Sequence, residues 1–166
     1  MLRVTAGTLR GRRVPFPPGD VRPTSERARQ AYFNIAGPRI AGARFLDLFA
    51  GSGIFSFEAV SRGAASATAV DQSPRNGETI ARLAAEWNVP VQTITGDALR
   101  ISGTYDLVYA DPPYDYTRYD DLLGAIRPRV AEGGLIAIEH RRRTQPFITA
   151  PDRTAEYGEV WISFFS

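Results

Sequence analysis

The chain has 166 residues, of which 43% are hydrophobic and 23% are charged, a composition typical of one folded domain and not of a disordered chain. No apolar run approaches the ~20 residues that span a bilayer, and the first residues lack the apolar stretch of a secretory signal. Cysteine is absent, which excludes a disulfide framework, a thiolate metal site and a cysteine nucleophile. We therefore expect a cytoplasmic protein without a metal site, and we expect it to be a monomer.

All 20 basic residues are arginine, and the net charge is only +2. A bias in genome composition is enough to explain the absence of lysine, although arginine is the better residue for bidentate phosphate contacts. The arginines gather in two clusters, Arg3, Arg10, Arg12, Arg13 and Arg22 near the start and Arg141, Arg142 and Arg143 near the end. Clustered positive charge is typical of proteins that bind a polyanion, so both clusters are candidate nucleic-acid contacts.

Residues 3–16 form two short extended pieces around a turn that contains two glycines, a pattern that predicts a β-hairpin. The hairpin has too few apolar side chains to make a core alone, so we expect it to lean on the main domain or on a partner. A linker rich in proline and glycine follows at 15–19. We therefore expect a hairpin extension with its linker at 1–20 and one larger domain at 21–166.

A helix is predicted after the linker, because Thr24 or Ser25 can serve as its N-cap. Apolar residues at helical spacing would bury one face of it, namely Ala28, Ala31, Tyr32 and Ile35. Gly37-Pro38 would end the helix.

From Arg44 onward, strand patterns alternate with helix patterns. Strands are predicted at 45–49, 67–70, 91–94, 105–110 and 135–139, and helices at 54–62, 74–87 and 120–127. This alternation predicts a parallel sheet covered on both sides. Two further strands at 153–157 and 159–165 meet at Gly158 and would close the sheet as an antiparallel hairpin. The predicted fold class is a three-layer α/β sandwich.

Acidic residues recur where these strands end, which is where open α/β sheets bind ligands. Asp47 lies in the first strand, Asp71 ends the second, Asp97 follows the third and Asp111 ends the fourth. One such aspartate is usually a helix cap or a turn residue, but four around one rim indicate a binding site.

The loop Phe49-Ala50-Gly51-Ser52-Gly53 would let a backbone pass close to a ligand, because its glycines carry no side chain. It lacks the third glycine of the dinucleotide fingerprint, and nothing in the chain matches a phosphate-binding P-loop with its lysine. Asp71 follows at about the 20-residue distance where an acid holds ribose hydroxyls. These features favour an adenosine ligand without a pyrophosphate, such as S-adenosylmethionine.

The most specific motif is Asp111-Pro112-Pro113-Tyr114. The prolines stiffen the turn and hold the preceding residue extended, so Asp111 and the Pro112 carbonyl can act as two fixed acceptors for the two hydrogens of an exocyclic amine. Tyr114 offers a face on which a flipped base can stack, worth about 1–3 kcal/mol. The alternative interpretation is a rigid turn with an exposed tyrosine. His140 could assist proton removal, but a structural role near the end of a strand is more typical.

Residues 47–53 together with 111–114 resemble the class I methyltransferases that modify exocyclic amines. The N-terminal stretches resemble more closely the RsmD family of 16S rRNA guanine-N2 methyltransferases, through RVTAG at 3–7, RGRR at 10–13, RPT at 22–24 and RQAYFNI at 29–35. The Tyr157-Gly158 hairpin and the aromatic end also fit, so the resemblance covers nearly the whole chain.

The resemblance implies a Rossmann-like, mostly parallel seven-stranded sheet, S-adenosyl-L-methionine as methyl donor, and an N-terminal hairpin that helps to bind RNA. The implied substrate is a guanine of small-subunit rRNA, in an assembled or assembling subunit. Asp71 and the adjacent Gln72 would hold the ribose and Asp97-Ala98 the adenine, while Thr24 and Asn34 would lie near the methionine end. The chain departs from the family in using arginine in place of lysine, and in having Tyr114 where phenylalanine is also common.

Two alternatives stay open at this point, because the motif alone does not distinguish guanine N2 from adenine N6 or cytosine N4. A DNA adenine-N6 or cytosine-N4 methyltransferase usually needs a region that reads base edges in the duplex, and no segment here is large enough to supply one. A non-catalytic RNA-binding assembly factor is disfavoured by the intact glycine loop and the intact diproline motif.

Overall fold

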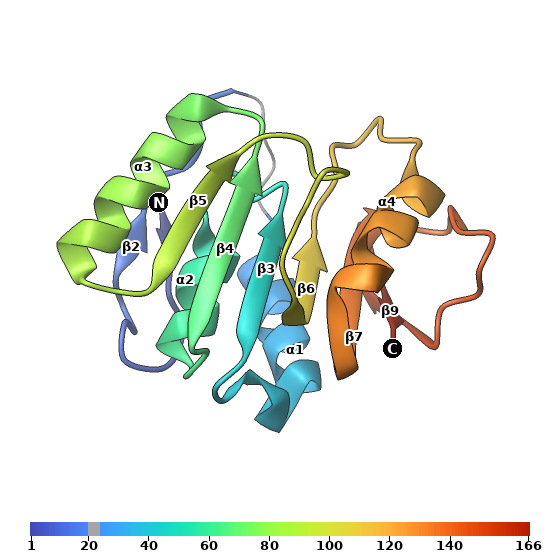
Figure 1. Ribbon diagram of the computed structural model, residues 1–166, viewed down its shortest axis with the longest axis horizontal. Helices are drawn as coiled ribbons and strands as arrows, with labels where there is room; N and C mark the ends of the chain where they lie inside the picture. The colour runs from blue at the N-terminus through green and yellow to red at the C-terminus, as the bar shows by residue number, and fades with distance from the viewer. Residues whose placement is uncertain (20–23) are drawn as a thin grey trace.

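The computed structural model describes residues 1–19 and 24–166, and its centre is a seven-stranded sheet in the order β5-β4-β3-β6-β7-β9-β8 (Figure 1). The strands are β3 (Arg44–Leu48), β4 (Ser66–Asp71), β5 (Val91–Thr95), β6 (Tyr105–Ala110), β7 (Val130–Arg141), β8 (Arg153–Tyr157) and β9 (Val160–Phe165). The strands from β5 to β7 are parallel, whereas β9 runs antiparallel to both of its neighbours. The predicted parallel sheet with a closing hairpin is therefore confirmed.

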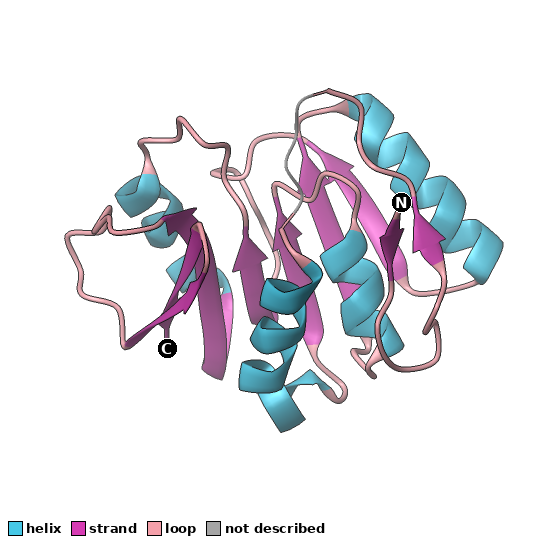
Figure 2. Cartoon of the chain, turned by 180° about the vertical axis from the view of Figure 1, so that it is seen from behind, coloured by secondary structure: helices cyan, strands magenta, loops and turns pink. Residues whose placement is uncertain are grey.

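Helices cover both faces of the sheet. They are α1 (Glu26–Ala36), α2 (Ile54–Ser61), α3 (Pro74–Trp87) and α4 (Tyr119–Ile126), with short 3-10 turns at Gly37–Ile40 and Arg127–Arg129. Side chains of α1, α2 and α3 share one apolar core with one face of the sheet, and α4 shares the second core with the other face. Figure 2 shows α1 and α2 in front of the sheet when the molecule is seen from behind. The three-layer sandwich is thus confirmed.

None of the helices described, of which the 14-residue α3 is the longest, is long and apolar enough to span a membrane.

The predicted N-terminal hairpin forms from β1 (Leu2–Arg3) and β2 (Arg13–Val14), and it docks on the end of α2. The backbone N–H of Thr8 donates to the Ser61 carbonyl at 2.9 Å, and that of Leu9 donates to Ser61 Oγ at 2.8 Å. Val14 is fully buried in the core shared with α1 and α2. The hairpin therefore leans on the rest of the chain, one of the two possibilities that its sparse apolar content suggested.

A buried carboxylate, Glu58 of α2, joins the hairpin to two helices. Its Oε1 accepts from the backbone N–H of Thr5 at 2.9 Å and from Nε of Arg29 at 3.2 Å. Its Oε2 accepts from Nε of Arg62 at 3.2 Å, and Arg29 Nη2 donates onward to the Arg3 carbonyl at 2.5 Å. Since burying a charge costs several kcal/mol unless it is paired, this network makes the docked hairpin part of the packing of α1 against α2.

The start of α1 matches the prediction, but its buried face is wider than expected. Ser25 is the N-cap and accepts from the Ala28 N–H at 3.1 Å. Ala31 and Ile35 are only partly buried, whereas Arg29, Phe33 and Ala36 are buried beside Ala28 and Tyr32. The prediction missed Arg29 because its burial depends on Glu58, a residue of another helix.

Candidate active site

The glycine loop and the diproline motif meet at the carboxyl edge of the sheet, because β3 and β6 are neighbouring parallel strands. The backbone N–H of Asp111 donates to the carbonyl of Leu48, the last residue of β3, at 3.2 Å. On the other side, the N–H of Ala50 donates to the Val70 carbonyl of β4 at 3.0 Å. Three strand ends are therefore tied together around residues 49–53.

The glycine loop uses backbone conformations that favour glycine. Gly51 and Gly53 have φ of 57° and 80°, in the left-handed region. A Cβ on Gly53 would lie 2.8 Å from Ile80 Cγ1, so only glycine lets the loop approach α3 this closely. At Gly51 a Cβ would find only the ring of Pro17, at 3.9 Å, so this backbone borders open space. Ser52 is buried and its Oγ accepts from the Ile54 N–H at 3.2 Å, at the start of α2.

Asp71 holds the glycine loop and the start of α3 together. Its Oδ2 accepts from the Gly51 N–H at 2.8 Å, and its Oδ1 accepts from the Ser73 N–H at 2.9 Å and from Asn76 Nδ2 at 3.2 Å. A carboxylate offers about four acceptor sites, so this partly buried side chain keeps capacity for a ligand hydroxyl. The next residue, Gln72, is exposed.

The segment after β5 lies beside Asp71, because the N–H of Gly96 donates to the Asp71 carbonyl at 3.0 Å. Asp97 is exposed, and its Oδ1 accepts from the Leu99 N–H at 2.9 Å, as expected of a turn residue. Ala98 is 4% exposed. The structure thus brings Asp97 and Ala98 to the same edge as the glycine loop.

Asp47 lies beneath the loop, not at its open side. The side chain is 2% exposed, and its Oδ2 accepts from Oγ and the N–H of Ser56 at 2.7 and 3.2 Å. Burial raises the pKa of this carboxyl to about 7, although the hydrogen bonds from Ser56 oppose the shift. Asp47 therefore supports the start of α2 from inside, and the expectation of direct cofactor contact is corrected because its carboxyl is enclosed.

Asp111 belongs to a buried polar cluster that the sequence did not reveal. Thr24 Oγ1 lies 3.2 Å from Asp111 Oδ2 and donates to Glu139 Oε2 at 2.6 Å. The hydroxyl of Tyr109 also donates to Glu139 Oε2. Glu139 is 8% exposed and Tyr109 is fully buried. A charged residue at the end of the apolar strand 135–139 was the one feature of the sequence that pointed to Glu139.

The two carboxyls of this cluster influence each other. Burial raises the pKa of Asp111 well above its ordinary value, and the negative charge of Glu139 raises it further. Burial also raises the pKa of Glu139, but the hydrogen bonds from Thr24 and Tyr109 oppose that shift. Two neighbouring carboxyls resist ionising together, so the pair holds a proton to higher pH than a free carboxyl does.

Tyr114 projects from the corner and is 78% exposed. The guanidinium of Arg141 lies 3.7 Å from the centre of its ring, and Arg141 Nε donates to the Tyr114 carbonyl at 3.0 Å. One face of the ring is therefore covered by Arg141, and the high exposure leaves the other face accessible. Pro112 is buried and Pro113 is exposed, so the corner is anchored at its base and open at its tip.

The comparisons with known proteins agree with this geometry. The sequence model of a family described as "Conserved hypothetical protein 95" matches residues 2–165. Ribosomal RNA small subunit methyltransferase D of Escherichia coli K12 is 33% identical over 147 residues, which cover 83% of this chain and 74% of that protein. The chain belongs to the RsmD family. A putative rRNA methyltransferase of Bacillus subtilis, YlbH, is 30% identical over 180 aligned positions, covering 99% of this chain and 98% of its own.

Solved structures share the RsmD-family fold. The putative methyltransferase yhhF from Escherichia coli superposes with a TM-score of 0.85 at 28% identity, covering 98% of this chain and 96% of its own. An RNA methyltransferase from Salinibacter ruber, solved with S-adenosyl-L-homocysteine, superposes with a TM-score of 0.72, covering 87% of this chain and 92% of its own. At 16% identity the second likeness shows the fold alone.

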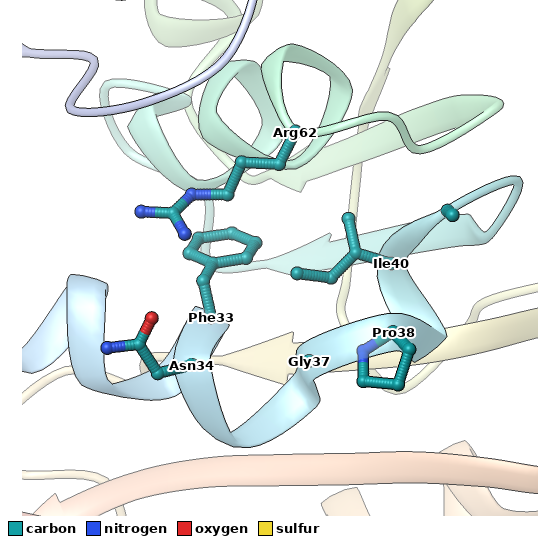
Figure 3. A pocket seen from close by; sticks show the side chains of 7 residues that line it. Phe33, Asn34, Gly37, Pro38, Ile40 and Arg62 are labelled. Carbon is teal, nitrogen blue, oxygen red and sulfur yellow. The ribbon is translucent and has the colours of Figure 1, made fainter.

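Asn34 does not join the site of this RsmD-family chain. It is exposed in the last turn of α1 and lines a cavity of about 450 Å³ together with Phe33, Gly37, Pro38, Ile40, Ala41 and Arg62 (Figure 3). At 1.5 Å per residue, Asn34 lies about 12 Å along α1 from Glu26, the first residue of the helix after Thr24. The cavity borders the amino ends of the strands, so the prediction that Asn34 lies near the methionine end is wrong: α1 carries it away from the carboxyl edge.

The two predicted arginine clusters of the RsmD-family chain lie on separate surfaces. In Figure 1 the hairpin and the loop after β7 are at opposite ends of the sheet. Arg10, Arg12 and Arg13 are exposed on the hairpin, with the Arg12 guanidinium 5.5 Å from the centre of the Trp87 ring. Near them a second cavity of about 330 Å³ is lined by Met1, Leu2, Arg3, Arg13, Glu26 and Arg29. Arg22 lies outside the described residues.

Some of the predicted arginines have acidic partners. Arg3 lies 3.3 Å from Glu26, and Arg142 lies 2.9 Å from Glu159. Arg143, which follows Arg142 on the loop after β7, is exposed. Exposed ion pairs of this kind contribute about 0–1 kcal/mol, so they leave the arginines free to exchange a carboxylate for a phosphate.

His140 has a structural environment. Its Nε2 lies 2.7 Å from Ser163 Oγ, and its Nδ1 lies 3.1 Å from Thr144 Oγ1. The ring is 5% exposed, and burial lowers its pKa. Both ring nitrogens are thus occupied between β7, β9 and the following loop.

Proposed function

We propose that this protein transfers a methyl group from S-adenosylmethionine to the exocyclic N2 of a guanine in the 16S rRNA of the small ribosomal subunit. The observation that carries the proposal is the hydrogen bond between Asp111 N–H and the Leu48 carbonyl, which sets the amine-binding corner directly beside the glycine loop. The relatives in Escherichia coli and Bacillus subtilis are named as an rRNA methyltransferase and a putative rRNA methyltransferase, and these names support the choice of RNA over DNA.

The carboxyl edge suits an adenosyl ligand. Gly51 and Gly96 both border open space, because a Cβ at either position would meet at most one atom within 4 Å. Asp71 lies between them and retains an acceptor site for ribose hydroxyls. We assign the ribose to Asp71 with Gln72, the adenine to Asp97 and Ala98, and the methionine end to the loop at 49–53. When bound, the donor supplies a methyl group already activated by its sulfonium.

The corner at 111–114 would do its chemistry through hydrogen bonding and position. The lone pair of an exocyclic amine is delocalised into its ring, so the amine is a poor nucleophile. Acceptors at Asp111 and the Pro112 carbonyl favour rehybridisation of the nitrogen and the positive charge that grows on it. Tyr114 supplies the stacking face, and fixed alignment of nitrogen and methyl group contributes much of the remaining rate.

Guanine must leave its helix to reach this corner, so the enzyme must also bind the RNA that surrounds the flipped base. RNA is recognised largely by shape and phosphate contacts, which arginines provide without a large reading domain. We assign these contacts to the hairpin arginines at 3, 10, 12 and 13, with Arg22, and to Arg141–Arg143.

The experiment that tests the proposal uses small ribosomal subunits that lack the modification. They are incubated with the full chain and labelled S-adenosylmethionine, and the rRNA is digested to nucleosides. The expected product is labelled N2-methylguanosine. Label in N6-methyladenosine or N4-methylcytidine would instead show that the methylated amine belongs to adenine or cytosine, and not to guanine. No label in subunits or in free 16S rRNA, together with no donor binding by calorimetry, would overturn the proposal.

A further inference from the structure

Glu139 and Asp111 are neighbours across two paired strands. Ala110 of β6 pairs with Ile138 of β7, so the next residue of each strand points to the opposite face. That face is the one covered by α1, α2 and α3, as the burial of Tyr109 and Ala137 in their shared core shows. The hydroxyl of Thr24 lies between the two carboxyls there, 2.6 Å from Glu139 Oε2 and 3.2 Å from Asp111 Oδ2.

The donors around Glu139 decide which carboxyl carries the proton. The hydroxyls of Thr24 and Tyr109 both direct their hydrogens at Glu139 Oε2. A hydroxyl has one hydrogen, and Thr24 Oγ1 is closer to Glu139 Oε2, at 2.6 Å, than to Asp111 Oδ2, at 3.2 Å, so Thr24 donates to Glu139. The contact between Thr24 and Asp111 then needs a hydrogen from Asp111, and we therefore place the proton of the pair on Asp111.

We propose that Glu139 is a positioning residue for methyl transfer, which keeps Asp111 as a neutral carboxyl by taking the hydrogen of Thr24, so that the Thr24 oxygen accepts the proton of Asp111 in a hydrogen bond. This inference rests on the proposed function of the same site. A neutral carboxyl has one hydroxyl, directed here at Thr24, and one oxygen left to accept a hydrogen of the target amine. Asp111 then binds the amine as an acceptor of fixed orientation and does not act as a base.

The step balances with Asp111 neutral throughout. The bond from sulfur to the methyl carbon breaks with its electron pair staying on sulfur, and the nitrogen lone pair forms the new bond to that carbon. The nitrogen then holds one surplus proton, which it loses to water. An ionised Asp111 would instead place a second negative charge beside Glu139 in a buried site, where it is costly.

Several other groups face the pair from the elements packed around it. They are Asp47 of β3, Tyr109 of β6 and Tyr119 of α4, and the charge of Arg141 in turn acts on Tyr119. Among the charges that act on Asp111, Glu139 has the largest effect and raises its pKa, while Asp47 raises it less. Removing the charge of Glu139 is therefore the direct way to lower the pKa of Asp111.

The first test is the pH profile of kcat for the Glu139→Gln variant. In the wild type, kcat should fall at high pH, where the proton of the pair is lost. In the variant this alkaline limb of the kcat profile should move to lower pH by about one unit or more. KM for the methyl donor should not change. Glu132→Gln, an exposed position of the same strand, is the control and should keep the wild-type profile. An unshifted limb in Glu139→Gln would overturn the inference.

The Asp111→Asn variant provides the complementary test. Its amide keeps a donor for Thr24 and an acceptor for the amine, so the variant should turn over measurably, faster than Asp111→Ala, and lack the alkaline limb of the profile. In this background Glu139→Gln should no longer move the profile. An Asp111→Asn variant as inactive as Asp111→Ala would show that the ionised carboxylate is required.

Infrared spectroscopy tests the shared proton without activity, so it also separates this inference from failure of the proposed function. The difference spectrum between wild type and Asp111→Asn at neutral pH should contain the band of a protonated carboxyl. Absence of that band in the folded protein would overturn the inference even if rRNA is methylated. Its presence in a protein that methylates no RNA would overturn only the proposed function. Tyr109→Phe, which removes one donor to Glu139, is the substitute variant if Glu139→Gln does not fold.

Discussion

Asp97 is exposed and Asp71 is partly buried at the carboxyl edge of the sheet, whereas Asp47 and Glu139 are enclosed at 2% and 8% exposure. The first two carboxylates keep acceptor sites for a ligand, and the enclosed ones satisfy groups of the chain itself. Asp111 stands between these cases, because it is partly buried and bonded to Thr24 yet begins the turn that leads to the open tip. The role of each of these carboxyl groups is thus set by its surroundings and not by its chemical type.

Substitution of Asp111 by alanine should lower methyl transfer by about 10²–10³-fold, because it removes one of two fixed acceptors for the amine. RNA binding should survive, since the arginine surfaces are untouched. The measurement is single-turnover methylation with saturating donor, accompanied by RNA binding in a filter assay. Equal turnover by the variant and the wild type would defeat the assigned role.

Asp47 should make stability depend on pH. Its pKa rises from the ordinary 3.8 to about 7 in the folded state, so the folded chain holds a proton that the unfolded chain releases. The stabilisation is complete below about pH 4 and is lost as pH rises through about 7, at no more than about 1.4 kcal/mol per pH unit.

The Asp47→Asn variant should lack this slope. Urea unfolding across the same pH range measures it as the difference between wild type and variant, and Asp115→Asn, at an exposed position, is the control. A constant difference between Asp47→Asn and wild type would contradict the prediction.

At the scale of elements, the N-terminal hairpin shows how a segment with little core of its own becomes ordered. Its two strands have only two residues each, so the hairpin depends on contacts with α2. Gly7 makes the closest of these, because a Cβ there would lie 1.8 Å from the Ser61 carbonyl oxygen. A glycine in the turn was visible in the sequence, but its contact with a helix more than 50 residues later was not.

Gly7→Ala should therefore destabilise the protein by about 1–3 kcal/mol more than Gly11→Ala. The two positions have nearly the same φ, 82° and 86°, but a Cβ on Gly11 would meet nothing within 4 Å. The difference between the variants thus measures the clash without the backbone strain. It can be determined by urea unfolding, and amide exchange at Thr8 and Leu9 should accelerate in Gly7→Ala alone. Equal losses in both variants would rule out the close contact as the cause.

At the scale of the whole molecule, the sheet separates the two arginine surfaces, and its carboxyl edge lies beside the segment that follows the hairpin. Pro17, in the segment after the hairpin, lies 3.9 Å from the position of a Gly51 Cβ. A short stretch of chain therefore connects the hairpin to the glycine loop at the carboxyl edge. On the other side of this edge, Arg141 donates a hydrogen bond to the Tyr114 carbonyl of the diproline corner. RNA that reaches both surfaces would pass over the carboxyl edge.

Changing Arg10, Arg12 and Arg13 to glutamine should weaken RNA binding and flatten its salt dependence by about two units of slope, as expected for three lost phosphate contacts. The measurement is the dissociation constant for 16S rRNA at several salt concentrations. A control variant with Arg39, Arg82 and Arg153 changed to glutamine loses the same charge at exposed positions elsewhere. If both variants lose the same slope, net charge and not the hairpin governs binding.

Local sequence was sufficient for the elements and for the edge at which the chemistry lies. The alternation of apolar runs with turn residues determined the order of strands and helices, and the diproline motif and the glycine loop each identified their own turn. Only the tertiary structure decided which polar groups face one another, as between Asp111 and Glu139, 28 positions apart, or between Glu58 and Arg29. It also removed Asn34 from the site and enclosed Asp47. The physical reason is that turns and amphipathic patterns depend on neighbours along the chain, whereas the burial and protonation of a polar side chain depend on partners that packing brings from elsewhere.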